Sequence, residues 1–252
     1  MRHVLHLASN QADRFPLGRN RTDDVVFDIS SSAMTVDQDE TMLMYVESAC
    51  IPVAGYPINS TNNVIFFASI SGDKVITIPE GVYANGSALV AAINPILTTV
   101  VGAGTLTLTW DALKYRISCT RSTTTVYSID AAKTTARGVI GSGYADLVLP
   151  QSSAVLFPAV IDLAGPKKFL ITSPDVELRT RDSLGNGVNV LAAIPVTQTY
   201  GGLVCYQNSS CGMLATNCKT LSELHLVLLD EDQLPVDMNG LEWAISIVIE
   251  IY

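Results

Sequence analysis

Cysteine, histidine and acidic side chains are the groups through which this 252-residue chain could bind a metal ion. Thiolates and imidazole together suit Zn²⁺, and one stretch of the sequence supplies both: Cys205, Cys211, Cys218 and His225. Structural zinc sites usually hold their ligands in closely spaced pairs, which this set lacks. His225 also alternates with two leucines, as an outward residue of a β-strand does. We therefore expect no zinc site here.

A short acidic loop offers oxygen ligands that Ca²⁺ prefers: Asp230, Glu231, Asp232 and Asp237. The order of ligands and glycine that defines an EF-hand loop is missing from it. Acidic turns are commonly no more than solvated connections. We expect neither a calcium site nor any cofactor.

Histidine, the commonest general base, is scarce in this sequence. Of the three histidines, His3 and His6 lie within the first six residues, so a Ser-His-Asp or Cys-His arrangement would depend on His225. Residues 182–185 (DSLG) differ from the aspartic-protease triplet, and residues 141–143 (GSG) lack the third glycine of a phosphate-binding loop. We predict no catalytic residue and no enzyme activity.

Basic residues cluster at one place in a chain whose formal net charge is −9. We interpret residues 1–24 as an extended arm that binds a partner through Arg14, Phe15, Arg19 and Arg21. The alternative is that the arginines only solvate a mobile tail, but such a tail has no need of an apolar side chain. The acidic net charge argues against direct binding of nucleic acid.

Hydrophobic periodicity indicates the elements that position these residues. Apolar residues recur at every second position in residues 224–228 and 243–251, so we predict that the chain ends in two long antiparallel strands, joined through Pro235 and Asn239-Gly240. Other strands are predicted over residues 25–29, 41–50, 64–70, 74–78, 106–110, 115–119, 124–129, 159–163, 167–172, 188–194 and 203–206. Residues 131–158 are interpreted as long loops.

One helix is expected, capped by Asn85 or Ser87 and shortened or kinked by Pro95. The predicted class is all-β, an antiparallel jelly-roll sandwich with a small inserted lobe of one helix and strands. Residues 25–83 and 131–252 would form the jelly roll, and residues 84–130 the lobe. The apolar residues 88–101 are too few and too interrupted to span a membrane.

Composition indicates assembly and a reducing compartment. Charged residues are only 15% of the chain and hydrophobic residues 48%, which favours surface buried against other subunits. The first residues lack the apolar run of a secretory signal, so we expect the five cysteines to be free thiols or buried small hydrophobes.

Several motifs occur together in an order that resembles a viral family. They are residues 7–14 (LASNQADR), 26–29 (VFDI), 47–52 (ESACIP), 56–63 (YPINSTNN), 76–83 (ITIPEGVY), 226–230 (LVLLD) and 236–243 (VDMNGLEW). The pattern resembles the penton or minor capsid proteins of virophages, Polinton-like viruses and large eukaryotic double-stranded DNA viruses, and it extends over most of the chain.

This resemblance implies a non-enzymatic jelly-roll protein of the virion, made in the interior of the host cell. It would assemble as a homopentamer at the vertices of an icosahedral capsid, among capsomers of a double-jelly-roll major capsid protein and other minor capsid proteins. A cement protein between or beneath capsomers remains an alternative. Another is a receptor- or carbohydrate-binding jelly roll that uses exposed Tyr83, Tyr144 or Tyr200.

Overall fold

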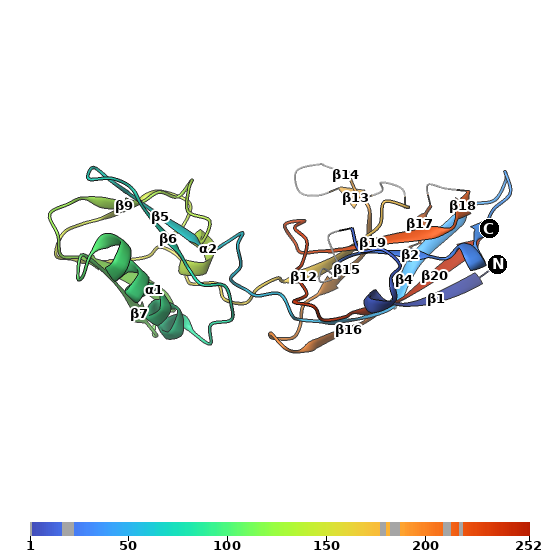
Figure 1. Ribbon diagram of the computed structural model, residues 1–252, viewed down its shortest axis with the longest axis horizontal. Helices are drawn as coiled ribbons and strands as arrows, with labels where there is room; N and C mark the ends of the chain where they lie inside the picture. The colour runs from blue at the N-terminus through green and yellow to red at the C-terminus, as the bar shows by residue number, and fades with distance from the viewer. Residues whose placement is uncertain (1, 17–22, 177–179, 182–186, 209–212, 217–218) are drawn as a thin grey trace. The chain divides into compact units, whose positions relative to one another are not determined.

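The computed structural model describes residues 2–16, 23–176, 180–181, 187–208, 213–216 and 219–252 (Figure 1). They form two compact units. The first unit comprises Met1–Gly55 and Pro166–Tyr252, and the second unit comprises Tyr56–Gly165. Each unit buries its own cluster of hydrophobic side chains.

A five-stranded and a four-stranded antiparallel sheet build the first unit. The β1–β16 sheet has the order β1 (Arg2–Ala8), β20 (Ala244–Ile251), β4 (Met42–Pro52) and β16 (Leu203–Gln207), and β17 (Leu214–Ala215) also pairs with β4. The β2–β15 sheet has the order β2 (Asp24–Asp28), β19 (Glu223–Leu229), β12 (Lys168–Thr172) and β15 (Val190–Pro195). Short pairs join β3 (Met34–Thr35) to β18 (Thr220–Leu221) and β13 (Thr180–Arg181) to β14 (Gly187–Val188).

The eight long strands of the first unit pass between the two sheets in the manner of a jelly roll. β1, β4, β16 and β20 belong to the β1–β16 sheet, and β2, β12, β15 and β19 belong to the β2–β15 sheet. In chain order, each of these strands is followed by one in the other sheet, except that β12 is followed by β15 of its own sheet. The second unit is inserted between the third and fourth of these strands, β4 and β12. The predicted all-β jelly roll is confirmed, because two sheets of this order can enclose a common core.

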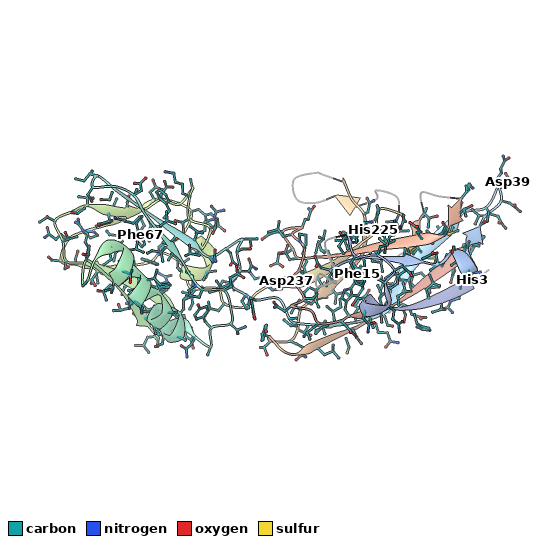
Figure 2. All side chains as sticks on the ribbon, in the orientation of Figure 1. His3, Phe15, Asp39, Phe67, His225 and Asp237 are labelled. Atoms are coloured by element: carbon teal, nitrogen blue, oxygen red, sulfur yellow. The ribbon has the colours of Figure 1, made fainter. Side chains whose placement is uncertain are left out.

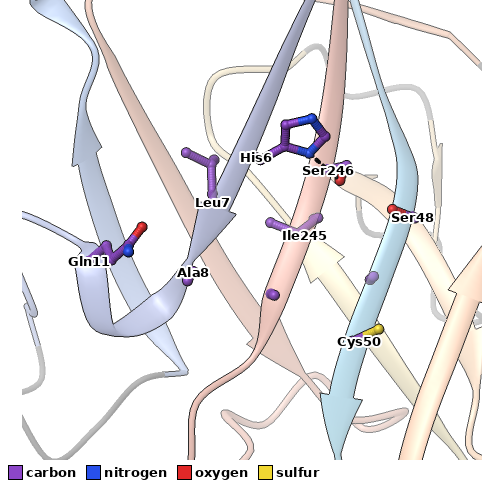
Figure 3. A pocket seen from close by; sticks show the side chains of 10 residues that line it. His6, Leu7, Ala8, Gln11, Ser48, Cys50, Ile245 and Ser246 are labelled. Atoms are coloured by element: carbon purple, nitrogen blue, oxygen red, sulfur yellow. Dashed lines mark hydrogen bonds between the residues drawn. The ribbon is translucent and has the colours of Figure 1, made fainter.

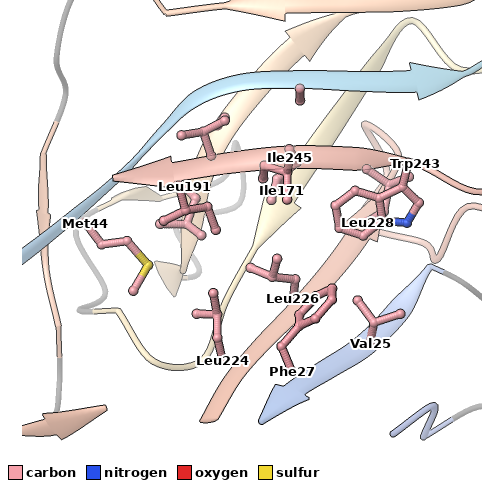
Figure 4. Close-up of a cluster of buried hydrophobic side chains, with 14 of the residues drawn as sticks. Val25, Phe27, Met44, Ile171, Leu191, Leu224, Leu226, Leu228, Trp243 and Ile245 are labelled. Carbon is pink, nitrogen blue, oxygen red and sulfur yellow. The ribbon is translucent and has the colours of Figure 1, made fainter. Parts of the chain in front are cut away.

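The core of the first unit is formed by alternate residues of the two sheets. Leu224, Leu226 and Leu228 of β19 are completely buried (Figure 4). Ile247 and Ile249 of β20, in the facing sheet, are also completely buried. These are the positions that the two-residue period marked. The last two strands do not pair with each other, however, since β19 and β20 belong to different sheets. A period of two identifies a strand and its buried face, but not its neighbour.

The expected N-terminal arm is instead largely the first strand of the jelly roll. β1 pairs with β20 over seven residues, and Leu5 and Leu7 pack against the core opposite Ile247 and Ile245. The 3₁₀ turn Ser9–Gln11 follows β1. Arg2 and His6, two outward residues of β1, are polar. Because a short edge strand with polar outward residues has the same composition as a solvated tail, the sequence alone indicated an arm.

Strand pairing in the second unit is more local. One sheet has the order β10 (Leu147–Leu149), β9 (Tyr127–Ile129), β5 (Val64–Ser69) and β6 (Lys74–Thr77), and another has β11 (Ala154–Leu156), β8 (Arg116–Arg121) and β7 (Leu106–Asp111). Helix α1 (Gly86–Val101) lies beside β7, and α2 (Arg137–Ile140) is a single turn (Figure 1). Within the described residues, no helix is long and apolar enough for a membrane crossing.

The boundaries of the second unit differ from those predicted for the lobe. Residues 64–77 were assigned to the jelly roll, but β5 pairs with β9, and Ile65 and Phe67 are buried with helix α1. The segment 131–158, expected to be loop, supplies α2, β10 and β11 to this unit. The strand expected at residues 159–163 is absent from the described structure. Short strands separated by glycine have too little periodicity to be recognised in isolation.

Helix α1 begins at the predicted cap, where the Asn85 side-chain oxygen accepts a hydrogen bond from Ala88 N at 3.0 Å. Its buried stripe includes Leu89 and Ile93. The helix runs on through Pro95 to Val101, so the proline does not end it there. Helix packing onto β7 offsets the one backbone hydrogen bond that proline cannot donate.

Candidate partner-binding site

The described part of the predicted partner-binding segment lies on the surface of the first unit. Arg14 joins the edge of β2, because Val26 N donates to Arg14 O at 3.0 Å and Arg14 N donates to Val26 O at 3.2 Å. The Phe15 side chain is partly buried against the core of the same unit (Figure 2). Arg19 and Arg21 lie outside the described residues. Phe15 therefore anchors the segment to its own unit, and Arg14 remains available at the surface.

The Arg14 guanidinium forms an ion pair with Glu223 of β19. More than half of each side chain is exposed, 59% for Arg14 and 56% for Glu223. An exposed pair of this kind contributes about 0–1 kcal/mol to stability, so either partner can exchange it for an external group at little cost.

Arg14 lies at an open hollow of about 350 Å³, which we call the Arg14 hollow. Its lining comes from four separate parts of the chain: Arg14, Pro16, Val26, Pro174, Asp175, Glu223 and His225. Sequence reasoning found Arg14 and missed the acidic residues beside it. Glu223 was detectable as the outward neighbour of His225 on β19, whereas nothing in the sequence indicates that Asp175 lies nearby.

Hydrogen bonds hold in place Asp175, which lines this hollow, and Asp24, which pairs with the lining residue His225. His225 Nε2 lies 2.6 Å from Asp24 Oδ1, and the His225 backbone N donates to Asp175 Oδ2 at 3.0 Å. Ser173 Oγ donates to the same Asp175 oxygen at 3.2 Å. The carboxylates of Asp24 and Asp175 thus join β2, β19 and the segment after β12. The hollow presents both positive and negative side chains, and these hydrogen bonds hold part of its lining in position.

The carboxyl group of Asp28, at the end of β2, is stabilised in its ionised form by its neighbours. Hydrogen bonds from the Ser30 side chain and then from its backbone N–H lower the pKa of the Asp28 carboxyl, and the charge of Arg14 lowers it further. The Asp28 backbone N in turn donates to Asp13 Oδ2 at 2.6 Å. The segment before β2 is therefore fastened to the strand by side-chain and backbone bonds.

A second open hollow, of about 360 Å³, lies on the outer face of the β1–β16 sheet. Figure 3 shows that His6, Ser48, Cys50 and Ser246 approach it from β1, β4 and β20. His6 Nδ1 lies 2.8 Å from Ser246 Oγ. Most of the lining side chains are small or apolar, and none is acidic or a lysine or arginine. This hollow therefore resembles a packing surface more than a reactive site.

The residues weighed for metal binding do not gather. Cys205 belongs to the β1–β16 sheet and His225 to the β2–β15 sheet, while Cys211 and Cys218 lie outside the described residues. Asp230 Oδ1 accepts hydrogen bonds from Asp232 N and Leu234 N, both at 2.9 Å, so this carboxylate caps its own turn. Among the described residues, no three His, Cys, Asp or Glu side chains are close enough to hold a metal ion.

The motifs weighed for catalysis have structural positions where they are described. Residues 141–143 follow α2 and form its C-terminal cap, with Gly141 in the left-handed conformation. Phosphate-binding loops instead precede a helix and present its N-terminus. Residues 182–185 lie outside the described residues.

The three tyrosines weighed for receptor binding differ in exposure. Tyr144 is 86% exposed, with the Arg137 guanidinium carbon 4.8 Å from the ring centroid. Tyr200 is 42% exposed. Tyr83 OH donates to Pro79 O at 2.8 Å and its ring packs against the core of the second unit, where burial raises the pKa of its hydroxyl.

Comparison with known proteins identifies a solved structure with the same fold. No protein-family model and no curated protein matches the sequence. The crystal structure of the mavirus penton protein matches with a TM-score of 0.52 and 13% identity, and the match covers 100% of both chains. A chain in the cryo-EM structure of the Sputnik virophage matches with a TM-score of 0.45 and 12% identity, over 98% of this chain and 97% of that one. This chain has, along its whole length, the fold of the mavirus penton protein.

Proposed function

We propose that this chain is a non-enzymatic structural protein of an icosahedral virus capsid, and that it forms the homopentameric penton at the five-fold vertices. The observation that carries the proposal is the fold shared with the mavirus penton protein over the full length of both chains. A match that includes both the jelly roll and the inserted unit is more specific than a jelly roll alone, which occurs in proteins of many functions.

The sequence supports the same role independently of the fold comparison. The motifs that resemble penton and minor capsid proteins lie in both units, from residues 7–14 to residues 236–243. The low content of charged residues, 15%, suits a chain whose surface is partly covered by neighbouring subunits. The virion is then its location, after synthesis in the host cell.

The absence of enzyme activity is part of the proposal and is supported by how the polar residues are used. His225 pairs with Asp24, Asp230 caps a turn, and Asp175 fixes a strand backbone. His225, the histidine on which a catalytic arrangement would have to depend, is thus occupied in a structural contact.

For the contact with other capsid proteins, we infer that the Arg14 hollow faces a neighbouring capsomer of the major capsid protein. Arg14 would release Glu223 and bind an acidic group of the partner, with Phe15 holding the segment in place. Arg19 and Arg21 would extend the same basic contact. Other minor capsid proteins are the second candidates for this surface.

One observation favours a second function for the second unit. Tyr144 is 86% exposed and lies against Arg137, and an exposed aromatic ring beside a cation is a common element of carbohydrate or receptor recognition. Loss of glycan-array binding in a Tyr144→Ala variant, with the oligomeric state unchanged, would establish this function. No binding by the unaltered protein counts against it.

The test of the penton proposal is the mass of the purified protein by light scattering, with negative-stain images of the same sample. Five copies in a ring are the expected result. Because a penton can also assemble only with its capsid, the protein is then co-expressed with its major capsid protein and located in the particles by cryo-EM. A monomer or trimer that is also absent from the vertices contradicts the proposal, and density between capsomers instead indicates a cement protein.

The same particles test the Arg14 contact. Arg14→Glu is expected to reduce incorporation several-fold, while Lys114→Glu in the second unit, at a side chain that is also exposed (62%) and also paired with a carboxylate, serves as the control for a change of charge. Equal incorporation of both variants would show that Arg14 does not contact a capsid partner.

A further inference from the structure

Two free cysteines face each other across neighbouring strands of the β1–β16 sheet. Cys50 of β4 and Cys205 of β16 are direct partners in the antiparallel register, and their Sγ atoms are 3.5 Å apart. Both residues are exposed, and Cys50 also lines the open hollow beside His6 (Figure 3). Two thiols that are 155 positions apart in the sequence are thus in contact where small molecules can reach them.

The position of this pair in the strand ladder suits a disulfide bond. Val53 N donates to Gly202 O at 2.8 Å, which identifies a hydrogen-bonded pair further along the same ladder. Hydrogen-bonded and non-hydrogen-bonded pairs alternate along an antiparallel ladder. Because Cys50 lies an odd number of residues from Val53 on β4, Cys50 and Cys205 form a non-hydrogen-bonded pair. The Cα atoms of such pairs are about 4.5 Å apart, within the range of about 4.4–6.8 Å found in disulfides. Closing the bond requires side-chain rotation and little backbone movement.

We propose that Cys50 and Cys205 form a cross-strand disulfide when the protein meets a small-molecule disulfide such as oxidised glutathione, and that this bond clamps edge strand β16 to β4. The thiolate of one cysteine attacks the glutathione disulfide, which forms a mixed disulfide and releases one glutathione. The second thiolate then attacks the protein sulfur and releases the other glutathione. The protein loses two electrons and two protons, and the oxidant becomes two molecules of glutathione.

The thiols of the chain differ in their readiness for this exchange, because the thiolate is the attacking species. The hydrogen bond with Cys205, and then burial, raise the pKa of the Cys50 thiol, so the exchange is faster at mildly alkaline pH. Burial raises the pKa of Cys119 to about 12, and this residue is only 1% exposed. Cys119 therefore serves as an internal control that should stay reduced.

The bond would act on a strand at the edge of its sheet. β16 pairs with β4 on one side only, at the edge of the β1–β16 sheet. A disulfide between residues 50 and 205 closes a loop that contains the whole second unit, and long loops give the largest entropic stabilisation in the chain-entropy model. The chemistry requires only the two thiols and an oxidant, so it does not depend on the proposed capsid role.

The test treats the purified full-length protein with oxidised glutathione and follows it by intact mass and peptide mapping. The expected product has lost the mass of two hydrogen atoms and contains a Cys50–Cys205 linked peptide, with Cys119 reduced. Amides of β16 should exchange with deuterium more slowly, while those of the other edge strand, β1, stay unchanged. The thermal midpoint of the first unit should rise by roughly 5–10 °C, and dithiothreitol should reverse both effects.

Variants separate this pair from the other cysteines. A Cys211→Ser/Cys218→Ser protein should form the same linkage, because neither residue takes part. Cys50→Ser and Cys205→Ser should each stop at a mixed disulfide with glutathione on the remaining cysteine. Stable glutathione adducts on both Cys50 and Cys205 of the unaltered protein, or a linkage from either one to Cys211 or Cys218, would overturn the proposal.

Discussion

The two units differ in how far along the chain their strands find partners. In the first unit, β1 near the start pairs with β20 at the end, with Arg2 opposite Glu250. In the second unit, β7 pairs with β8 through the short connection that follows Asp111, and β5 pairs with β6 across Gly72. The first unit can form its core only after both ends of the chain have met, whereas no strand pairing described in the second unit spans more of the sequence than that of β5 with β9.

The two units also differ in the elements that form their hydrophobic cores. The first unit is a sandwich of two sheets whose facing side chains form one core. The second combines two small sheets with helix α1, and Phe67, Ile76 and Leu89 from three elements meet in its core. Since each core is complete within its own unit, damage to one should leave the other folded.

The largest expected effect tests whether the two cores are independent. Phe169 of β12 and Phe67 of β5 are completely buried, one in each core. Truncating either to alanine should lower the free energy of unfolding of its own unit by roughly 3–5 kcal/mol, from lost burial and the cavity left behind. Urea unfolding followed by hydrogen exchange and mass spectrometry assigns the loss to peptides of one unit.

Each variant is the control for the other. Phe169→Ala should weaken protection in β12 and β19 while leaving β5 and β6 unchanged, and Phe67→Ala should do the reverse. If either substitution destabilises both units equally, the chain unfolds as one cooperative body and the two cores are not independent.

The next effect concerns the long-range pairing of β1. Leu5 packs against the core opposite Ile247, while the neighbouring Val4 points outward and is 41% exposed. Leu5→Asn should cost about 1–3 kcal/mol of stability, because it places a polar amide against the core, and Val4→Asn should change stability by roughly 0.5 kcal/mol or less. Thermal unfolding of the two variants provides the measurement. Equally small effects would mean that residues 2–8 behave as the loose arm expected from sequence.

Sequence reasoning succeeded where the signal is local. The alternation of Leu224, Leu226 and Leu228 located β19 and its buried face, and Asn85 located the start of α1. The class of fold followed from many strands and one long helix. Each of these features depends on residues within a few positions of one another, which is the range over which propensity and periodicity act.

Periodicity and propensity did not predict which strands pair or which distant residues come together. Nothing in the period of β19 and β20 distinguishes a hairpin from two strands in opposite sheets, so their pairing was predicted wrongly. The separation of β5 and β6 from the jelly roll depends on contacts with α1 and β9, which are tertiary. At the candidate site, Arg14 was found from its charge, but its neighbour Asp175 is brought there only by folding.

A smaller effect tests the local character of the second unit. The Asn85 side chain accepts the backbone N–H of Ala88 at the start of α1. Asn85→Ala should lower the stability of the second unit by about 0.5–2 kcal/mol, because it leaves that N–H without its cap, while Asn85→Asp should retain most of it. Urea midpoints of this unit, read from its own peptides, compare the two variants. Equal losses in both would show that the position matters for something other than the cap.

The smallest effect is specific to the first unit and depends on pH. Burial raises the pKa of Asp230 above its ordinary value of 3.8, and the nearby charges of Asp232 and Glu231 act in the same direction. The folded state therefore holds this proton more tightly than the unfolded state, and the ionised carboxylate weakens the fold at every pH above the folded pKa. Asp230→Asn removes that charge and retains an oxygen for the N–H groups of Asp232 and Leu234.

The Asp230→Asn protein should thus have a slightly higher urea midpoint near neutral pH. The advantage should shrink as the pH falls through the raised pKa, and it should vanish below 3.8, where Asp230 is protonated in both states. Asp39→Asn, at an exposed position, is the control for the loss of one negative charge. A variant that is less stable than the unaltered protein near neutral pH would mean that the charged carboxylate is worth more as a turn cap than its burial costs, and that the β19–β20 connection is held by electrostatics.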